Sequence, residues 1–387
     1  MKNNLGNLNE VYIAGAGITQ WGYFPDRECK DFGTEAVIRS LEDAGMEWKQ
    51  IQGAFCGSVY QGTGSGHQAL NQVGLTGIPI INIENACSSA SSAFRLGYNH
   101  VAYGINDIVI VLGMEKMPKG PIPSTAFSEW ELKSGFNFQP GNYALAAKKY
   151  IEKVNMTEED FSLVTVKNRK NGSLNPNARF QKPVTLEEVI NSRLVADPLR
   201  LLHCCPLADG AVAFVLCNKK SLKKMNKPVS IEAAVLKSGY YGEEYPPGGL
   251  IGSVNYFSSK SMAVQSAMEA YEIAGVGPED VDLAQVYDAV APSEMWEVEE
   301  LGLCDEGEAL EYLVRGNFDL DGEIPINTDG GLIARGHPLG ASAGGQIYEL
   351  LVQLRGEAGK RQVEKAKIGL SHSMGAGPNS TLVILKS

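Results

Sequence analysis

Short apolar runs alternate with longer amphipathic stretches along the first hundred residues of the chain. The runs have the length of β-strands, and the stretches have the spacing of helices with one buried face. This pattern predicts strands at Val11–Ala16, Ile51–Cys56, Ile80–Ile83 and Asp107–Leu112, and helices at Thr34–Ala44 and Ser88–Gly104. Gly45 follows the first helix, at a place where a glycine commonly ends one. The alternation is typical of a layered α/β fold.

The second half of the chain repeats this order of elements. It predicts strands at Val229–Leu236, Val281–Val286 and Lys367–Leu370, and helices at Ser261–Ala274 and within Gly336–Leu354. Gly275 ends a helix before a strand, just as Gly45 does in the first half. We therefore expect two related units, residues 1–225 and 226–387. The repeat places the loop of Cys87 opposite the loop of His337, each just before a helix.

Residues 117–205 differ in character from both halves, because they carry several prolines and clusters of Lys and Arg. We expect an inserted loop domain packed over the first half, with helices at Pro140–Val154 and Thr157–Asn171. Its basic clusters, Lys148-Lys149 and Lys167 to Lys170, either face solvent or bind the phosphates of a ligand. Charge runs on helices are most often solvated, which favours the first alternative.

The composition limits the classes of function. The chain has 387 residues, enough for about two or three domains. Its 34 basic and 45 acidic residues give a net charge of −11, which argues against non-specific nucleic-acid binding. No apolar run reaches the ~18 residues of a membrane-spanning helix, and Met1–Leu5 has no hydrophobic signal core. Seven irregularly spaced cysteines indicate a reducing compartment, so we expect a cytoplasmic protein.

The first candidate for chemistry is Cys87, in the segment Asn85–Ala93. It lies between a predicted strand and the first turn of a helix rich in Ser and Ala. A helix N-terminus stabilises a thiolate and so lowers the pKa of the thiol, and small neighbours let an acyl group reach the sulfur. A lone cysteine is more often a buried structural residue, but this setting favours a nucleophile.

Two histidines of the second half lie in glycine-rich segments. His337 stands between Gly336 and Pro338, where it can take a proton from a thiol or bind a developing oxyanion. His372 precedes Gly375, where a turn after a strand can direct backbone amides at a carbonyl oxygen. One cysteine and two histidines after three separate strands are typical of a Cys/His acyl-transfer site.

Three segments resemble the thiolase superfamily, and the resemblance extends over essentially the whole chain. They are the Cys87 loop with its helix, Ala208–Ala213, and Asn327–Ser342, which is close to the signature Asn-x-x-Gly-Gly-x-Ile-Ala-x-Gly-His-Pro-x-Gly. The resemblance implies two βαβαβαββ halves in a five-layered α/β/α/β/α arrangement, with the loop domain inserted in the first. It also implies a homodimer, and an acyltransferase that uses coenzyme A as a substrate and holds no permanent cofactor.

The same resemblance assigns roles to individual residues. Cys87 would be the acylated nucleophile, and His337 would activate it and line an oxyanion hole. The amides of Cys87 and Gly375 would form a second oxyanion hole. Ser373 stands at about the place of the second cysteine of biosynthetic thiolases, whereas His372 is similar to a histidine of the sterol-carrier-protein-type thiolases. We therefore take His372 as the second acid/base and Ser373 as a weaker candidate.

Tyr287 departs from the family pattern, because other thiolases use an Asn or a His there to hold a water or an oxyanion. A tyrosine at this place resembles thiolase-fold retro-aldolases, but those enzymes lack the nucleophilic cysteine that this chain retains. The combination resembles large thiolase subunits that work with a small zinc-ribbon/OB-fold protein, and among them the benzoylsuccinyl-CoA thiolases of anaerobic toluene degradation. Zinc would then belong to the partner, with no metal in this chain.

We expect CoA-dependent cleavage of a 3-oxoacyl-CoA, branched or aromatic, through an acyl intermediate on Cys87. Two alternatives stay open: a retro-aldolase that acts on a 3-hydroxyacyl-CoA with Tyr287 as base, and a non-catalytic acyl or lipid carrier subunit. The remaining candidates have structural interpretations. Cys204 and Cys205 lack a second pair at zinc-ligand spacing and are expected in the core, and Glu297–Glu300 is expected to be a solvated helix face.

Overall fold

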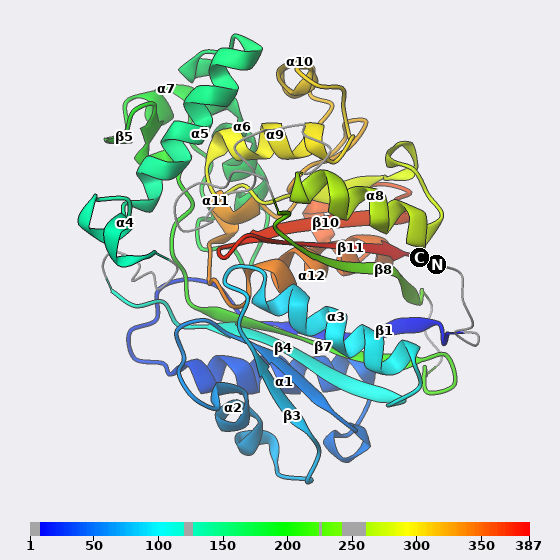
Figure 1. Cartoon of the computed structure of the whole chain (residues 1–387). Helices are drawn as coiled ribbons and strands as arrows, with labels where there is room; N and C mark the ends of the chain where they lie inside the picture. Colours follow the sequence, from blue (N-terminus) through cyan, green and yellow to red (C-terminus); the bar gives the residue numbers. More distant parts are fainter. Residues whose placement is uncertain (1–7, 120–126, 224–226, 242–260) are drawn as a thin grey trace.

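The computed structural model describes residues 8–119, 127–223, 227–241 and 261–387 (Figure 1). The segment Met1–Leu5, in which no signal core is predicted, lies outside the described residues. The described part contains a nine-stranded sheet with the strand order β3-β2-β4-β7-β1-β8-β11-β10-β9, and a separate two-stranded sheet.

The first half of the chain supplies one end of the large sheet. Its elements are β1 (Val11–Ile18), α1 (Cys29–Ala44), β2 (Ala54–Gly57), α2 (Ser65–Val73), β3 (Ile80–Ile83), α3 (Ser89–Ala102), β4 (Ile108–Glu115) and β7 (Gly210–Asn218). β2 pairs in parallel with β3 and β4, whereas β7 is antiparallel to β4 and β1. Every residue of β4 and β7 is buried, as expected of strands covered by helices on both faces.

The second half supplies the other end. Its elements are β8 (Val229–Ser238), α8 (Met262–Ala274), β9 (Leu283–Gln285), α9 (Ala291–Glu300), α10 (Ala309–Val314), α11 (Gly331–Arg335), α12 (Ser342–Arg355), β10 (Ile368–Gly375) and β11 (Asn379–Lys386). Only a short pairing of Tyr12 and Ile13 with β8 joins the two groups of strands. Figure 1 shows these groups as two layers, with α3 and α12 between them and further helices on both outer faces. This is the predicted α/β/α/β/α arrangement of a thiolase fold.

The insertion between β4 and β7 carries α4 (Glu129–Lys133), α5 (Gln139–Val154), α6 (Glu158–Ser173), α7 (Leu186–Ile190), β5 (Leu194–Ala196) and β6 (Leu199–Arg200). Helices α5 and α6 pack on α9, and α6 also packs on α10 and α11, all in the second half. The expectation that the insertion packs over the first half is therefore wrong. Ala147, Tyr150 and Phe161 of the insertion share one apolar core with α9, so burial of that surface decides where the insertion lies.

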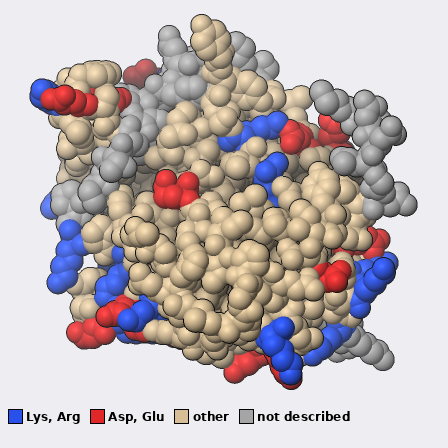
Figure 2. Space-filling view, turned by 60° about the horizontal axis from the view of Figure 1, so that its bottom comes forward, with Lys and Arg blue, Asp and Glu red and all other residues tan. Residues whose placement is uncertain are grey.

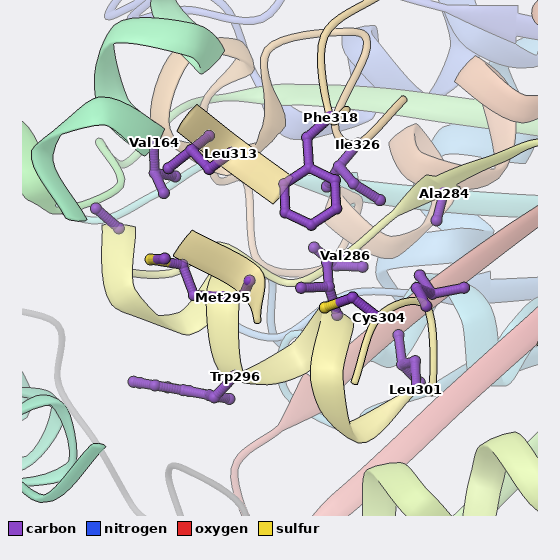
Figure 3. Packing of buried hydrophobic residues seen from close by; sticks show 14 of the residues in the cluster. Val164, Ala284, Val286, Met295, Trp296, Leu301, Cys304, Leu313, Phe318 and Ile326 are labelled. Atoms are coloured by element: carbon purple, nitrogen blue, oxygen red, sulfur yellow. The ribbon is translucent and has the colours of Figure 1, made fainter. Parts of the chain in front are cut away.

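That core holds α9 in place (Figure 3). Val286, Met295, Trp296, Phe318 and Ile326 are all buried in it, and they come from segments on either side of α9 as well as from α9 itself. Interiors of this kind are densely packed, so small changes of volume are felt by the whole cluster. The position of α9 matters for the site, because α9 carries a glutamate that binds the backbone of Tyr287.

The predicted helices agree with the structure to within a few residues. Gly45 and Gly275 end α1 and α8 with left-handed φ angles of 59° and 68°, as expected. The last predicted strand was too short, because β10 continues beyond Leu370 to Gly375. His372 therefore lies within a strand and not after one.

Replacing Phe318, which is 1% exposed, by Ala leaves a cavity in the core beneath α9. We expect the free energy of unfolding to fall by about 3–5 kcal/mol, measured by urea denaturation followed by tryptophan fluorescence. Val314→Ala, at a side chain that is 64% exposed, is the control and should change stability little. A similar loss in both variants would contradict this account of the core.

Candidate active site

The loop between β3 and α3 presents Cys87. Ala86, just before it, has a left-handed φ of 48°, which is uncommon for a residue other than glycine and is often found at functional sites. Serines of α3 hold the loop in this conformation: Ser89 Oγ accepts from the Asn85 amide at 2.9 Å and donates to the Ala86 carbonyl at 2.7 Å. The hydroxyl-rich start of α3 thus fixes the backbone that carries the thiol.

The Cys87 thiol is packed closely by protein, yet the residue keeps part of its surface accessible to solvent. Burial raises the pKa of the thiol to about 11, although a hydrogen-bond interaction with Tyr287 lowers it in part. The expectation of a low thiol pKa is therefore wrong, because desolvation outweighs the helix terminus. Cys87 is a neutral thiol at pH 7 and needs a base that takes its proton.

His337 lies at the same site and is buried. Its backbone amide donates to the Pro206 carbonyl at 2.9 Å, and its Nδ1 lies 2.6 Å from Ser342 Oγ. Ser342 already donates its one proton to the Pro338 carbonyl at 3.0 Å. The hydroxyl must therefore accept from Nδ1–H, which leaves Nε2 unprotonated.

The free nitrogen of His337 faces Tyr287. Nε2 lies 3.3 Å from the tyrosine hydroxyl, and the two rings meet edge to face at 5.6 Å. Burial, and after it Arg335, lowers the pKa of His337 to about 3, so the imidazole is neutral over the whole physiological range. Because the Tyr287 hydroxyl also interacts with Cys87, it connects the candidate nucleophile to the candidate base.

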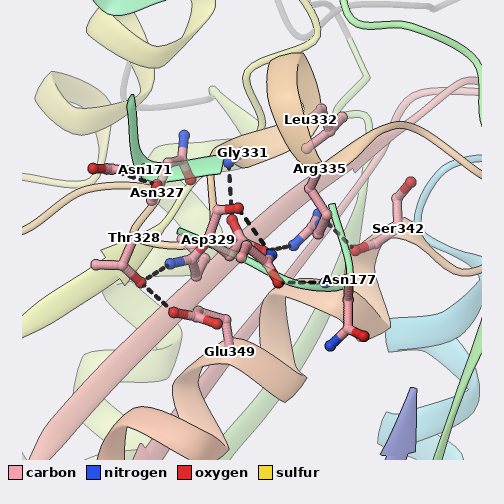
Figure 4. Close-up of polar contacts among 12 residues, drawn as sticks. Asn171, Asn177, Asn327, Thr328, Asp329, Gly331, Leu332, Arg335, Ser342 and Glu349 are labelled. Carbon is pink, nitrogen blue, oxygen red and sulfur yellow. Dashed lines mark hydrogen bonds and ion pairs between the residues drawn. The ribbon is translucent and has the colours of Figure 1, made fainter. Parts of the chain in front are cut away.

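A buried polar network supports the loop of His337 (Figure 4). Asp329 forms an ion pair with Arg335 and accepts from the Gly331 amide at 2.8 Å, and Arg335 donates to the Ser342 carbonyl at 3.2 Å. The same Ser342 orients the His337 ring. Buried charges are stable only when paired and hydrogen-bonded, and this pairing ties both ends of the loop to each other.

Tyr287 is fixed from its backbone. Its amide donates to Glu297 Oε2 of α9 at 2.9 Å, and the next residue, Asp288, accepts from the Leu332 amide at 2.6 Å at the start of α11. Glu297 and Glu299 are 2% and 6% exposed. The expectation of a solvated face at Glu297–Glu300 is therefore wrong for these glutamates, because they face partners inside the protein.

His372 and Ser373 lie next to each other in β10 and so point to opposite faces of the sheet. His372 is fully buried, with Nδ1 2.8 Å from Glu297 Oε2 and Nε2 2.9 Å from Ser380 Oγ. The backbone carbonyl of Ser373 accepts from Ser88 Oγ at 3.3 Å, whereas its own hydroxyl has no partner among the described residues. The strand thus brings both residues close to the site, but from different sides.

Gly375 lies against the loop of Cys87. A Cβ atom at Gly375 would stand 2.4 Å from the Asn85 carbonyl oxygen, closer than real Cβ atoms approach. Only glycine therefore fits between β10 and this loop.

Several polar side chains near the site gave no signal in the sequence. Tyr143 of α5 interacts with the Tyr287 hydroxyl, and together with Cys205 and Cys87 it packs on an apolar cluster. The two cysteines at 204 and 205 were expected in the core, but both are partly exposed. Lys167, expected on a solvated face, is buried and forms an ion pair with Glu294 at 2.9 Å, whereas Lys170 is exposed as expected.

A thiol, a neutral imidazole and a hydroxyl that connects them are the elements of nucleophilic acyl transfer. Within the described ranges, no group of three or more His, Cys, Asp or Glu could hold a metal ion. The fold and the candidate site together are those of an acyltransferase.

The chain belongs to the thiolase family. Its residues 11–220 match the thiolase N-terminal domain, and residues 252–387 match the thiolase C-terminal domain-like family. It is an acyltransferase for which coenzyme A is a substrate. No helix in the described part of the chain has both the length and the apolar character to cross a membrane.

Relatives from several groups align with nearly the whole chain. An acetyl-CoA acetyltransferase of Methanothermobacter thermautotrophicus is 37% identical, with 95% of this chain and 97% of the relative covered. A benzoylsuccinyl-CoA thiolase subunit of Thauera aromatica is 36% identical, with 95% of each covered. Sterol carrier protein 2 of Bos taurus is also 36% identical, with 98% of this chain and 72% of the relative covered.

Two solved structures are similar in fold to this chain, to different degrees. The Ltp2-ChsH2(DUF35) aldolase superposes with a TM-score of 0.86 at 26% identity, with 98% of both chains covered. Human mitochondrial 3-ketoacyl-CoA thiolase superposes with a TM-score of 0.73 at 19% identity, over 99% of this chain and 100% of that one. The second likeness shows the fold alone.

Tyr287→Phe removes the hydroxyl that interacts with the Cys87 thiolate. The pKa of Cys87 then rises above its value of about 11, and less thiolate is present at any given pH. In the parent protein, we expect the rate at which iodoacetamide labels Cys87 to rise about tenfold for each pH unit between about pH 7 and 9.5. In the variant, the labelling rate should be lower than in the parent at every pH. Labelling is followed by peptide mass spectrometry, with Tyr150→Phe as the control. Equal rates for Tyr287→Phe and the parent would refute the interaction.

Proposed function

We propose that this enzyme cleaves a 3-oxoacyl-CoA thiolytically through an acyl intermediate on Cys87. The observation that carries the proposal is that the Tyr287 hydroxyl interacts both with Cys87 and with His337 Nε2, and that this nitrogen is unprotonated. A neutral thiol with a pKa near 11 can be used at pH 7 only if a base removes its proton during attack.

The first half-reaction forms the acyl-enzyme. Tyr287 passes its proton to His337 Nε2 and receives the proton of Cys87, while the sulfur bonds to the 3-oxo carbon. The bond between the α- and β-carbons then breaks, and its electrons leave on the CoA-thioester enolate. The proton held by His337 returns through Tyr287 to the α-carbon, which releases the first acyl-CoA.

The second half-reaction uses the same groups. Free coenzyme A loses its thiol proton to the Tyr287–His337 pair, and its sulfur attacks the acyl carbon on Cys87. The Cys87 thiolate leaves, takes that proton back, and the second acyl-CoA departs. Amides of Cys87 and Gly375 are proposed donors for the oxyanions in both steps, as in the family. We assign His372 to holding Tyr287 in place through Glu297, so that it supports the proton transfer from His337, and Ser373 is the weaker candidate for a second acid/base.

The acyl group is proposed to be branched or aromatic. The side chains next to Cys87 and Tyr287 are apolar and partly flexible, namely Met262, Ala289, Leu332 and Met374. Methionine side chains adapt their shape to irregular ligands. One relative is named as a benzoylsuccinyl-CoA thiolase subunit. Both observations support a bulky acyl group, of which benzoylsuccinyl-CoA is an example.

A retro-aldolase acting on a 3-hydroxyacyl-CoA is the second candidate function. Tyr287 and the likeness to the Ltp2-ChsH2(DUF35) aldolase favour it. Coenzyme A separates the two reactions, because thiolysis consumes one molecule for each bond broken and retro-aldol cleavage consumes none.

Cys87→Ala removes the nucleophile and should lower the rate of thiolytic cleavage by roughly a thousandfold or more. Intact-protein mass after brief exposure to a panel of 3-oxoacyl-CoA esters should show an acyl adduct on the parent and on Cys29→Ala, the control, but not on Cys87→Ala. Near-normal turnover in Cys87→Ala would overturn the proposal. Cleavage without consumption of coenzyme A would favour the aldolase.

Two partners belong to the proposal. A second copy of the chain is proposed to pair with β3, which is the edge strand of the described sheet and leaves Ile81 42% exposed. In Figure 2 the bottom of the molecule as seen in Figure 1 is turned forward, and the centre of this face shows few charged side chains. A small zinc-ribbon/OB-fold subunit is proposed as well, supported by the words subunit and DUF35 in the names of two similar proteins.

Ile81→Lys places a charge on the free edge of β3 and should shift the protein from dimer towards monomer. Sedimentation velocity over a concentration series measures the shift. Ile273→Lys, at a somewhat more exposed isoleucine of α8 (53%), is the control and should sediment like the parent. A dimer that survives Ile81→Lys unchanged would exclude this edge as the interface.

A further inference from the structure

The inserted domain contributes one polar side chain to the immediate surroundings of Cys87. Tyr143 of α5 packs on the apolar cluster of Met262, Tyr287, Leu332 and Met374, where Cys87 also lies. Its hydroxyl interacts with that of Tyr287. Two phenol groups from different domains thus meet beside the nucleophilic sulfur.

The hydrogen-bond capacity of Tyr287 is limited. Its oxygen carries one proton, for which His337 Nε2 at 3.3 Å, the Cys87 sulfur and the Tyr143 oxygen compete. Once Cys87 carries an acyl group, the thiol proton is gone and a carbonyl oxygen stands next to the sulfur. Besides the two amides proposed above, that oxygen can accept from a further donor, and Tyr287 is engaged with His337.

We propose that Tyr143 is a catalytic residue whose hydroxyl donates to the carbonyl oxygen of the acyl group on Cys87. The proposal rests on the acyl-enzyme of the proposed function and adds a donor that the inserted domain supplies. A phenol hydroxyl turns about its C–O bond, so the proton of Tyr143 can be directed at the acyl oxygen without any change of backbone. The ligand class is a thioester carbonyl, which becomes an oxyanion during attack by either thiol.

The electrostatic setting supports a donor role. Burial, together with the nearby Cys87 and Cys205, raises the pKa of Tyr143 well above its usual value. The hydroxyl therefore keeps its proton throughout the working pH range. A donor that is fixed in place and shielded from water contributes most to the stabilisation of a developing oxyanion.

A purely structural tyrosine is the competing explanation, and α5 offers a matched control for it. Tyr150 lies about two turns further along the helix, is fully buried, and donates to Glu299 at 2.9 Å. It packs against Trp296 in the core beneath the insertion and not on the cluster around Cys87. Tyr150→Phe thus removes a buried phenol hydroxyl from the same helix without touching the site.

The test compares the parent, Tyr143→Phe and Tyr150→Phe in single-turnover acylation, measured as the mass adduct on Cys87 after rapid mixing with the best-labelling 3-oxoacyl-CoA. We expect acylation to slow roughly a hundredfold in Tyr143→Phe, with KM nearly unchanged, and to stay near the parent rate in Tyr150→Phe. Thermal unfolding of both variants is recorded alongside, and a loss of stability in both with slow acylation in Tyr143→Phe alone supports the donor role.

Two outcomes would overturn the proposal, and they differ from each other. If the parent is acylated and Tyr143→Phe is acylated as fast as Tyr150→Phe, Tyr143 is not a donor and the proposed thiolase mechanism stands. If no thioester labels Cys87 in the parent, the acyl-enzyme itself is refuted, and the role of Tyr143 falls with it.

Discussion

The hydroxyl of Tyr287 is the contact on which the organisation of the site depends. It lies 3.3 Å from the unprotonated nitrogen of His337 and interacts with the thiol of Cys87, so it joins residues from the two halves of the chain. Two hydrogen bonds fix the backbone that carries it. Glu297 of α9 binds its backbone amide, and Asp288 ties the following backbone to the start of α11.

Burial sets the protonation states of the reacting groups, and it does so in opposite directions for thiol and imidazole. It raises the pKa of Cys87 to about 11 and lowers that of His337 to about 3. A stable thiolate–imidazolium pair is therefore disfavoured at rest. In the proposed mechanism the proton leaves Cys87 as the sulfur attacks, when the charge appears on an oxyanion that donors can stabilise. Such a site is unreactive until a substrate supplies that oxygen.

Local sequence patterns predicted the parts of the site that are themselves local. A cysteine before a Ser-rich helix and a histidine between a glycine and a proline define their own backbone geometry, and both lie in loops before helices, as expected. The alternation of strands and helices and the repeat predicted a layered α/β fold with two related halves, and the resemblance to thiolases implied its five-layered arrangement. Tyr143, Glu297 and Lys167 could not be predicted in this way, because their roles arise from packing between segments distant in sequence. Charge patterns misled for the same reason: a Lys or Glu on a helix looks solvated until its buried partner is known.

The position of the inserted domain links these observations. Its helices share a core with α9, and α9 holds Tyr287 through Glu297 while α5 carries Tyr143. The two tyrosines are therefore fixed by the same packed surface, although they come from different domains. A shift of α9 would displace both hydroxyls together relative to Cys87, whose loop is anchored on α3. The inserted domain thus supplies one of the two tyrosines near Cys87 and packs on the helix that positions the other.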